Sequence, residues 1–96
     1  MKVTISRSDR PEKRYKAVFS DNSKKVKTVH FGLKGGSTYI DHGDDKKKDA
    51  YIARHKVREN FNDPMTAGSL AFHILWGESK SLNENIKKFK KRFNLS

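Results

Sequence analysis

In the first third of the chain, hydrophobic residues alternate with polar ones. β-branched and aromatic residues on a period of two are typical of strands with one buried face. Asp21, Asn22 and Ser23 separate the second and third runs and favour a turn. We therefore predict a three-stranded antiparallel meander, with residues 38–40 as a candidate fourth strand. The residues predicted to face the core are Val3, Ile5, Tyr15, Ala17, Phe19, Val29 and Phe31.

In the second half, apolar residues recur at helical spacing instead. Asp44 or Asp45 can cap a first helix that runs to about Asn60, and Pro64 fits the first turn of a second helix. Ser81 and Glu84 fit the capping box of a third helix. The predicted stripes are Ala50, Ala53, Val57 and Phe61 in the first helix, Leu70, Ala71, Ile74 and Leu75 in the second, and Leu82, Ile86, Phe89 and Phe93 in the third.

The order of these elements predicts the fold class. Strands followed by helices, with no internal repeat or linker, indicate one α+β domain over residues 1–96. Residues 1–44 would form mainly strands and loops, and residues 45–96 would be helical. Because the chain is 33% hydrophobic and 34% charged, with a mean hydropathy of −0.94, we expect a thin core and a heavily solvated surface.

Features that the sequence lacks narrow the classes of function. The chain has no cysteine, which excludes disulfides, thiolate nucleophiles and cysteine-based metal centres. No apolar run reaches the roughly 20 residues of a membrane helix, and the first residues lack the apolar stretch of a secretion signal. We therefore expect a protein of the cell interior or of a particle, not secreted and without a membrane partner.

Charge is the strongest functional signal in this sequence. Its 22 Lys and Arg residues against 11 Asp and Glu give a formal net charge of +11, and such an excess favours polyanionic partners. The polar side of the third predicted helix carries cations without interleaved acids: Lys87, Lys88, Lys90, Lys91 and Arg92. We predict that they contact phosphates. The alternative is a solvated face whose cations suit the C-terminal end of the helix dipole.

A second basic group lies on the first predicted helix. Its opening lysines would stand in a first turn, where cations oppose the helix dipole, so local stability does not explain them. The group predicted to bind nucleic acid consists of Lys46, Lys47, Lys48, Arg54, Lys56 and Arg58. A nuclear-import signal or a solvated loop is the alternative. The sheet lysines Lys24, Lys25 and Lys27 are explained at least as well by protection of an edge strand against aggregation.

Metal and catalytic chemistry have little support. The histidines form no tight paired motif, whereas zinc needs three or four converging ligands. No residue pattern pairs a base with a nucleophile. The glycine-containing segment 32–37 lacks the spacing of a phosphate-binding loop, so we predict a plain turn there. We expect no metal, no cofactor and no enzymatic activity. The histidines considered are His30, His42, His55 and His73.

Several segments resemble a known family. The most specific is residues 51–70, with Arg54-His55-Lys56 near its start and Thr66-Ala67-Gly68 near its end, followed by residues 72–77 and 86–93 and supported by residues 29–32 and 35–41. Across residues 24–95 they resemble an uncharacterised family of short basic proteins of large double-stranded DNA viruses of algae and amoebae. The resemblance implies a viral protein carried in the virion and assigns no site residue. For Asp63 to Gly68, a corner between packed helices is favoured over a functional role.

Two hypotheses of different classes follow. The first is a non-enzymatic, virion-associated protein that binds double-stranded nucleic acid, duplex DNA above all, through its phosphates. The second is a minor capsid or scaffold protein that contacts acidic surfaces of coat proteins. Single-strand binders stack bases on exposed rings. We expect the candidate rings to pack in the core, which favours backbone contact without sequence preference. These rings are Tyr15, Tyr39 and Trp76.

Overall fold

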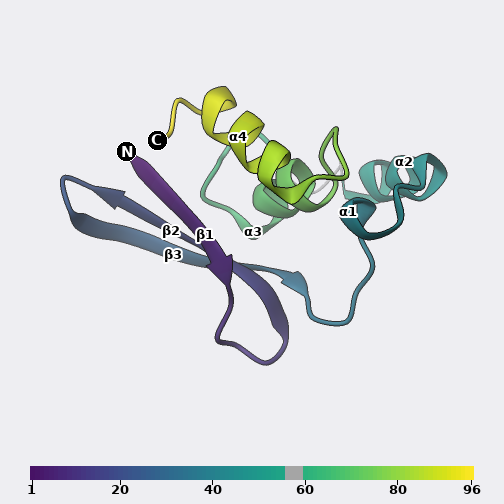
Figure 1. Ribbon diagram of the computed structural model, residues 1–96, viewed down its shortest axis with the longest axis horizontal. Coiled ribbons are helices and arrows are strands. Elements are labelled where there is room, and N and C mark those ends of the chain that lie inside the picture. Colours follow the sequence, from purple (N-terminus) through teal and green to yellow (C-terminus); the bar gives the residue numbers. More distant parts are fainter. Residues whose placement is uncertain (56–59) are drawn as a thin grey trace.

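The computed structural model describes residues 1–55 and 60–96. Its sheet has the strand order β1-β2-β3 and is antiparallel, with β1 at Lys2–Arg7, β2 at Lys13–Asp21 and β3 at Lys24–Leu33. The helices that follow are α1 (Tyr39–His42), α2 (Asp45–His55), α3 (Ala67–Leu70), the π-helix η1 (Ala71–Leu75) and α4 (Leu82–Arg92). The predicted α+β class, with a meander before the helices, is therefore confirmed (Figure 1).

The sheet follows the predicted alternation of buried and exposed residues. Val3 of β1 pairs with Phe19 of β2, and both side chains are buried together with Phe31 of β3. The β2–β3 hairpin closes at Asn22 and Ser23, whose φ angles of 50° and 66° are those of a tight two-residue turn. Both features were expected from the period of two and from the turn residues, because a strand alternates its faces and Asn tolerates positive φ.

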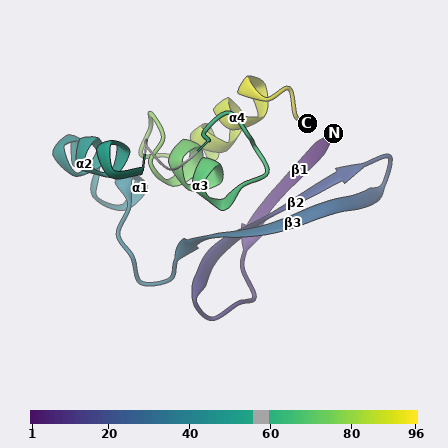
Figure 2. The same ribbon diagram turned by 180° about the vertical axis from the view of Figure 1, so that it is seen from behind.

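The helices form a layer against one face of the sheet. In Figures 1 and 2, α3 and α4 lie over the sheet, whereas α2 lies beside them at the end of the molecule farthest from the strands. Leu70, Ile74 and Leu75 of α3 and η1 are fully buried, as is Phe89 of α4. They join the sheet residues in one hydrophobic cluster. The predicted stripes of the second and third helices are thus confirmed as the apolar sides that face the core.

The start of the helical region differs from the prediction at two places. Residues 39–42 form the short helix α1 rather than a fourth strand, because the Asp41 carboxylate accepts hydrogen bonds from the backbone and hydroxyl of Thr38. Asn60 is not helical, and the described part of α2 ends at His55. The connection between His55 and Asn60 falls on residues outside those described.

The predicted apolar stripe of the first helix is wrong for the two residues of α2 that can be judged. Ala50 and Ala53 are exposed, and Val57 lies outside the described residues. Tyr51 is the buried residue of α2, and its ring stacks on the Trp76 ring with centroids 4.4 Å apart. A tyrosine ring buries far more area than two alanine methyl groups, so it decides which side of the helix faces inward.

The second predicted helix begins later than expected, and the third begins where predicted. α3 starts after Thr66, whose hydroxyl accepts from the backbone of Ser69 at 3.2 Å, and Pro64 lies in the turn before it. At α4, Ser81 Oγ accepts from the backbone of Glu84 at 3.3 Å, which confirms Ser81 as the N-cap. The other half of the predicted capping box does not form, because the Ser81 backbone N donates to Ser79 Oγ rather than to the Glu84 carboxylate.

The two ends of the chain meet at the outer edge of β1 (Figure 1). Val3 N donates to the carbonyl of Ser96 at 3.0 Å, and Ser96 N donates to the carbonyl of Met1 at 3.1 Å. Ser96 therefore extends the sheet beyond β1 by one backbone-paired residue. At the opposite edge of the sheet, β3 presents exposed lysines and Val26, which is 53% exposed.

Arg14 of β2 ties the sheet to α1. Its Nη1 and Nη2 donate to the two carboxylate oxygens of Asp41, each at 2.7 Å, and Thr38 N and Oγ1 each donate to Asp41 Oδ2 at 2.8 Å. The hydrogen bond with Arg14 is the main reason why the pKa of Asp41 lies well below the ordinary value of an aspartate. The ionised carboxylate thus holds α1 against the sheet.

Acid should weaken this connection. A carboxyl whose pKa is lower in the folded than in the unfolded protein stabilises the fold fully above its unfolded pKa of about 3.9, and the stabilisation is lost as pH falls through the folded pKa. We expect the difference in unfolding free energy between wild type and Asp41→Asn to be largest above about pH 4 and to shrink below it. Urea unfolding from neutral pH into the acid range measures this difference, and a constant difference would contradict the expectation.

Candidate nucleic-acid interface

Along α4, the charged side is separated from the apolar side. Residues three or four positions apart lie on the same side of a helix, so Lys87 and Lys91 share the exposed side opposite the buried Phe89. Lys88 and Arg92, also four apart, form a neighbouring exposed row. Four of the five predicted α4 cations therefore lie on adjoining exposed rows of one helix; the fifth, Lys90, is half-buried.

Among the α4 cations, only Lys88 has an acidic neighbour within the part of the chain that the structure describes. Its Nζ lies 3.3 Å from Glu78 Oε2 and 3.6 Å from Glu84 Oε1. Exposed ion pairs contribute little stability and exchange readily for other partners. The positive charge of this helix is therefore largely uncompensated and faces solvent.

A cleft of about 810 Å³ opens between α2, η1 and α4. Lys88, Lys91 and Arg92 of α4 line it together with Lys48 of α2. Glu78 is the one acidic residue in this lining as described. The other lining residues are Ile52, Phe72, His73, Trp76, Gly77, Asn85 and Phe89. The structure thus brings one member of the second basic group beside the α4 cations.

Lys48 is held at the cleft by two contacts. Its Nζ donates to the carbonyl of Gly77 at 2.9 Å and lies 4.6 Å from the centroid of the Tyr39 ring. The Tyr39 hydroxyl in turn donates to Asp45 Oδ1 at 2.9 Å. A cation over an aromatic face keeps its charge in a fixed place while its outer side stays hydrated.

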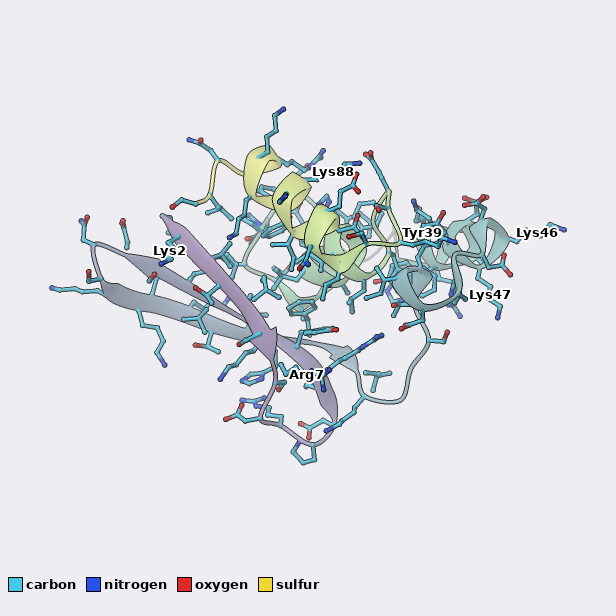
Figure 3. All side chains as sticks on the ribbon, in the orientation of Figure 1. Lys2, Arg7, Tyr39, Lys46, Lys47 and Lys88 are labelled. Carbon is cyan, nitrogen blue, oxygen red and sulfur yellow. The ribbon has the colours of Figure 1, made fainter. Side chains whose placement is uncertain are left out.

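The rest of the second basic group does not join the α4 surface. Figure 3 shows Lys46 and Lys47 at the outer end of the molecule, directed away from Lys88. Both are exposed, as is Arg54. Lys56 and Arg58 lie outside the described residues. Asp44 Oδ1 accepts from the backbones of Lys46 and Lys47 at 3.0 and 3.3 Å, so the first turn of α2 has the acidic cap that the sequence predicted.

Asn85 is a structural residue of the cleft that the sequence analysis missed. It is 1% exposed, its Nδ2 donates to the carbonyls of Ile74 and Ser79 at 2.9 and 2.7 Å, and its Oδ1 accepts from Ser79 N at 3.0 Å. A Cβ at Gly77 would lie 2.7 Å from Asn85 Cγ, so only glycine at position 77 allows the backbone to lie this close to the Asn85 amide. Asn85 thereby fixes the wall of the cleft that holds Lys48. The sequence did contain a signal for its burial: Asn85 lies three residues after Leu82 and four before Phe89, on the apolar side of the helix.

The histidines are engaged in separate structural contacts. His73 Nε2 lies 2.8 Å from the carbonyl of Phe61, and burial, reinforced by the nearby Arg92 charge, lowers the pKa of His73 below its ordinary value. His30 Nδ1 is hydrogen-bonded to Ser8 Oγ, and His42 Nδ1 accepts from the backbone N–H of Asp44. The His55 ring stacks on the Tyr51 ring. Within residues 1–55 and 60–96, no group of three or more His, Cys, Asp or Glu is placed to hold a metal ion.

The candidate stacking rings are packing groups, as predicted. Trp76 is 9% exposed, and Tyr15 and Tyr39 are partly buried against the hydrophobic cluster. No helix in the described part of the chain is long and apolar enough to cross a membrane. The interface therefore offers cations at its surface and keeps its aromatic rings largely beneath them.

Comparisons with known proteins give two similarities. The model of a family of unknown function (DUF5754) matches residues 3–55, from β1 to the described end of α2. An uncharacterised protein of Acanthamoeba polyphaga mimivirus is 37% identical over 80 residues, which cover 77% of this chain and 80% of that protein. No solved structure matches the chain. The viral relative agrees with the expected viral context, and the family match begins further toward the N-terminus than the resemblance at residues 24–95.

Proposed function

We propose that this chain, which belongs to the family of unknown function DUF5754, binds double-stranded nucleic acid through the phosphates and catalyses no reaction. We also propose that it is one of the short basic proteins of large double-stranded DNA viruses of algae and amoebae, and that it acts inside the virion. The relative in Acanthamoeba polyphaga mimivirus and the net charge of +11 support this placement.

The observation that carries the proposal is the exposed basic side of α4. Lys87, Lys91 and Arg92 have no ion pair with another described residue, and the helix is anchored from behind by the buried Phe89. A rigid row of cations can neutralise successive phosphates and release their counterions. Lys48, fixed across the cleft, adds a cation from a second element.

A duplex is favoured over a single strand because the rings are covered. Binding of single strands depends on bases that stack on accessible aromatic faces. Trp76 and Phe89 at the cleft are 9% and 1% exposed. Phe72, which is partly exposed there, is stacked on Phe61 with ring centroids 4.0 Å apart. Contact with the backbone alone suits a duplex, whose phosphates face outward in a regular array.

The competing function is a minor capsid or scaffold protein whose charge matches acidic faces of coat proteins. The same exposed lysines would serve it, since interfacial charge steers association with any surface of opposite sign. What distinguishes the two is the response to salt and to charge reversal on α4.

A salt series on duplex DNA tests the proposal. If α4 neutralises about five phosphates, the plot of log affinity against log salt should have a slope of roughly −4 to −5. Affinity should be about micromolar or tighter at low salt and nearly equal for unrelated sequences. Fluorescence anisotropy with two labelled duplexes of different sequence measures both quantities. A slope shallower than about −1, or a strong preference for one duplex, would contradict the proposal.

A further inference from the structure

A second pocket, of about 390 Å³, lies at the far end of the sheet and gathers cations from three segments. Arg7 ends β1, Arg14 belongs to β2, and Lys34 stands in the turn after β3. None of its lining residues also lines the cleft beside α4, and Figure 3 shows Arg7 well apart from Lys88. The other described residues of the lining are Ser8, Tyr15, Gly35 and Gly36, so the lining as described contains no acid.

Arg14 is pre-positioned by the bond that ties the sheet to α1. Its hydrogen bonds to Asp41 and to Thr38 Oγ1 use both N–H groups of Nη1 and one of Nη2. A guanidinium has five N–H donors, so Nε and the second N–H of Nη2 lie side by side on the edge away from Asp41. That edge is a fork of the kind that binds two oxygens of a phosphate or carboxylate at once. Tyr15, which also lines the pocket, lies near this guanidinium: its ring centroid is 5.5 Å from Arg14 Cζ, and after Asp41 it contributes to the raised pKa of Arg14.

Arg7 and Lys34 carry charges that no acid offsets within the described chain. Both are exposed and have no ion pair with another described residue. The turn that holds Lys34 is itself fixed, since Lys34 N donates to the carbonyl of Glu12 at 3.1 Å and Gly36 N to that of Leu33 at 3.0 Å. Within residues 32–37, Gly32 and Leu33 belong to β3 and the turn itself lies at Lys34 and Gly35, so the turn is shorter than predicted.

The turn after β3 is open to solvent at Gly35. Gly35 has a φ of 85°, and no heavy atom lies within 4 Å of the place where a Cβ would stand. Backbone without a side chain lets a ligand approach closely. The pocket therefore combines an open glycine turn with the fixed guanidinium of Arg14 and the exposed cations of Arg7 and Lys34.

The pocket carries a net positive charge. Asp41 neutralises Arg14, whereas Arg7 and Lys34 have no ion pair with another described residue. A tetrahedral dianion would offset both of these charges and present oxygens to the edge of Arg14 away from Asp41. We infer that this pocket binds a phosphate group, either inorganic phosphate or a phosphomonoester.

The same chemistry has two sources: a small phosphorylated molecule, or a phosphate of the nucleic acid that the proposed function places on α4. The inference does not depend on that function, because the pocket and the α4 surface share no residue. Binding of phosphate alone and binding of duplex DNA are therefore measured separately.

The test follows the amide signals of the full-length chain by NMR while inorganic phosphate replaces chloride at constant ionic strength. We expect saturable shifts at Gly35 and Gly36. The double variant Arg7→Gln with Lys34→Gln should weaken phosphate binding by about tenfold or more, since each charge-assisted hydrogen bond contributes substantially. Arg14 stays in place because its replacement would also release Asp41.

The control is Lys24→Gln with Lys25→Gln, which removes the same charge from exposed positions of β3 outside the pocket lining. Its phosphate affinity should stay within about twofold of wild type, as expected for residues that make no direct contact. Shifts that do not saturate, or equal losses in both double variants, would show general attraction of anions to a basic protein and overturn the inference.

Duplex DNA separates the two sources once phosphate binding is established. If the Arg7 and Lys34 variant loses phosphate affinity but keeps its duplex affinity, the pocket serves a small phosphorylated ligand. If both affinities fall together, a nucleic-acid phosphate occupies it. Either result supports the phosphate site, and a failure of the α4 proposal would appear instead as unchanged duplex affinity and salt slope after charge reversal on α4.

Discussion

Reversing Lys87, Lys88 and Lys91 to glutamate should weaken binding to duplex DNA by about a hundredfold or more at low salt. Each phosphate neutralised contributes about 0.9 to the slope of log affinity against log salt, so losing three should flatten that slope by about 3. The loss should be similar for unrelated sequences, because phosphates carry no sequence information. Anisotropy titrations across a salt series measure all three effects.

The three side chains are exposed, and the apolar side of α4 is left unchanged, so the variant should fold normally. The matched control reverses Lys24, Lys25 and Lys27 on β3, which are also exposed and change the net charge by the same amount. Compared at about 0.1 M salt, its effect should be much smaller than that of the α4 reversal, since distant charges are screened beyond about 10 Å at that ionic strength. Equal losses in the two variants would mean that total charge, rather than α4, governs binding.

If the α4 reversal leaves both affinity and slope intact, α4 is not the nucleic-acid surface. The capsid or scaffold hypothesis then takes its place. In that case we expect the α4 variant to keep weak DNA binding through its remaining cations and to lose retention on an acidic coat-protein surface.

Replacing Asn85 by alanine should destabilise the protein by about 3 to 5 kcal/mol. The amide makes three hydrogen bonds, to Ile74 and to both backbone groups of Ser79, in a position that is 1% exposed. Its removal leaves buried donors and acceptors unpaired, each at a cost of about 1–3 kcal/mol. Urea unfolding monitored by circular dichroism gives the difference in free energy.

Asn83 provides the matched control for this change. It is the same residue type, lies in the same helix, and is exposed. Asn83→Ala should change the unfolding free energy by no more than about 0.5 kcal/mol. A loss at Asn85 no larger than the loss at Asn83 would show that the turn from Ile74 to Ser79 is held without the amide.

The parts of the fold that depend on local periodicity were predictable from the sequence. Alternation placed Val3, Phe19 and Phe31 in the core, and helical spacing placed Phe89 there. The side of α2 that faces inward was not predictable, because alanine fits both exposed and buried positions. Tyr51 settles it through a stacking contact with Trp76, a residue far along the chain that no local pattern reveals.

The same distinction between local pattern and contacts of distant residues applies to the candidate sites. The five α4 cations lie within six positions of the sequence, so their common surface could be expected from one helix. Lys48 reaches the cleft only through its contacts with Gly77 and Tyr39. Arg7, Arg14 and Lys34 meet because three strands pair in register, and no spacing along the chain encodes that meeting.

The meeting of the chain ends at β1 limits how copies of this protein can aggregate. An incoming strand that paired with the start of β1 would first have to displace Ser96 from its bonds to Met1 and Val3. Open growth of a sheet into a fibre needs two free edges on every copy. Here the β1 edge is occupied at its start, and the β3 edge is lined with lysines, which would repel the lysines of a second copy. Together, the two edges therefore disfavour polymerisation of this protein through its strands.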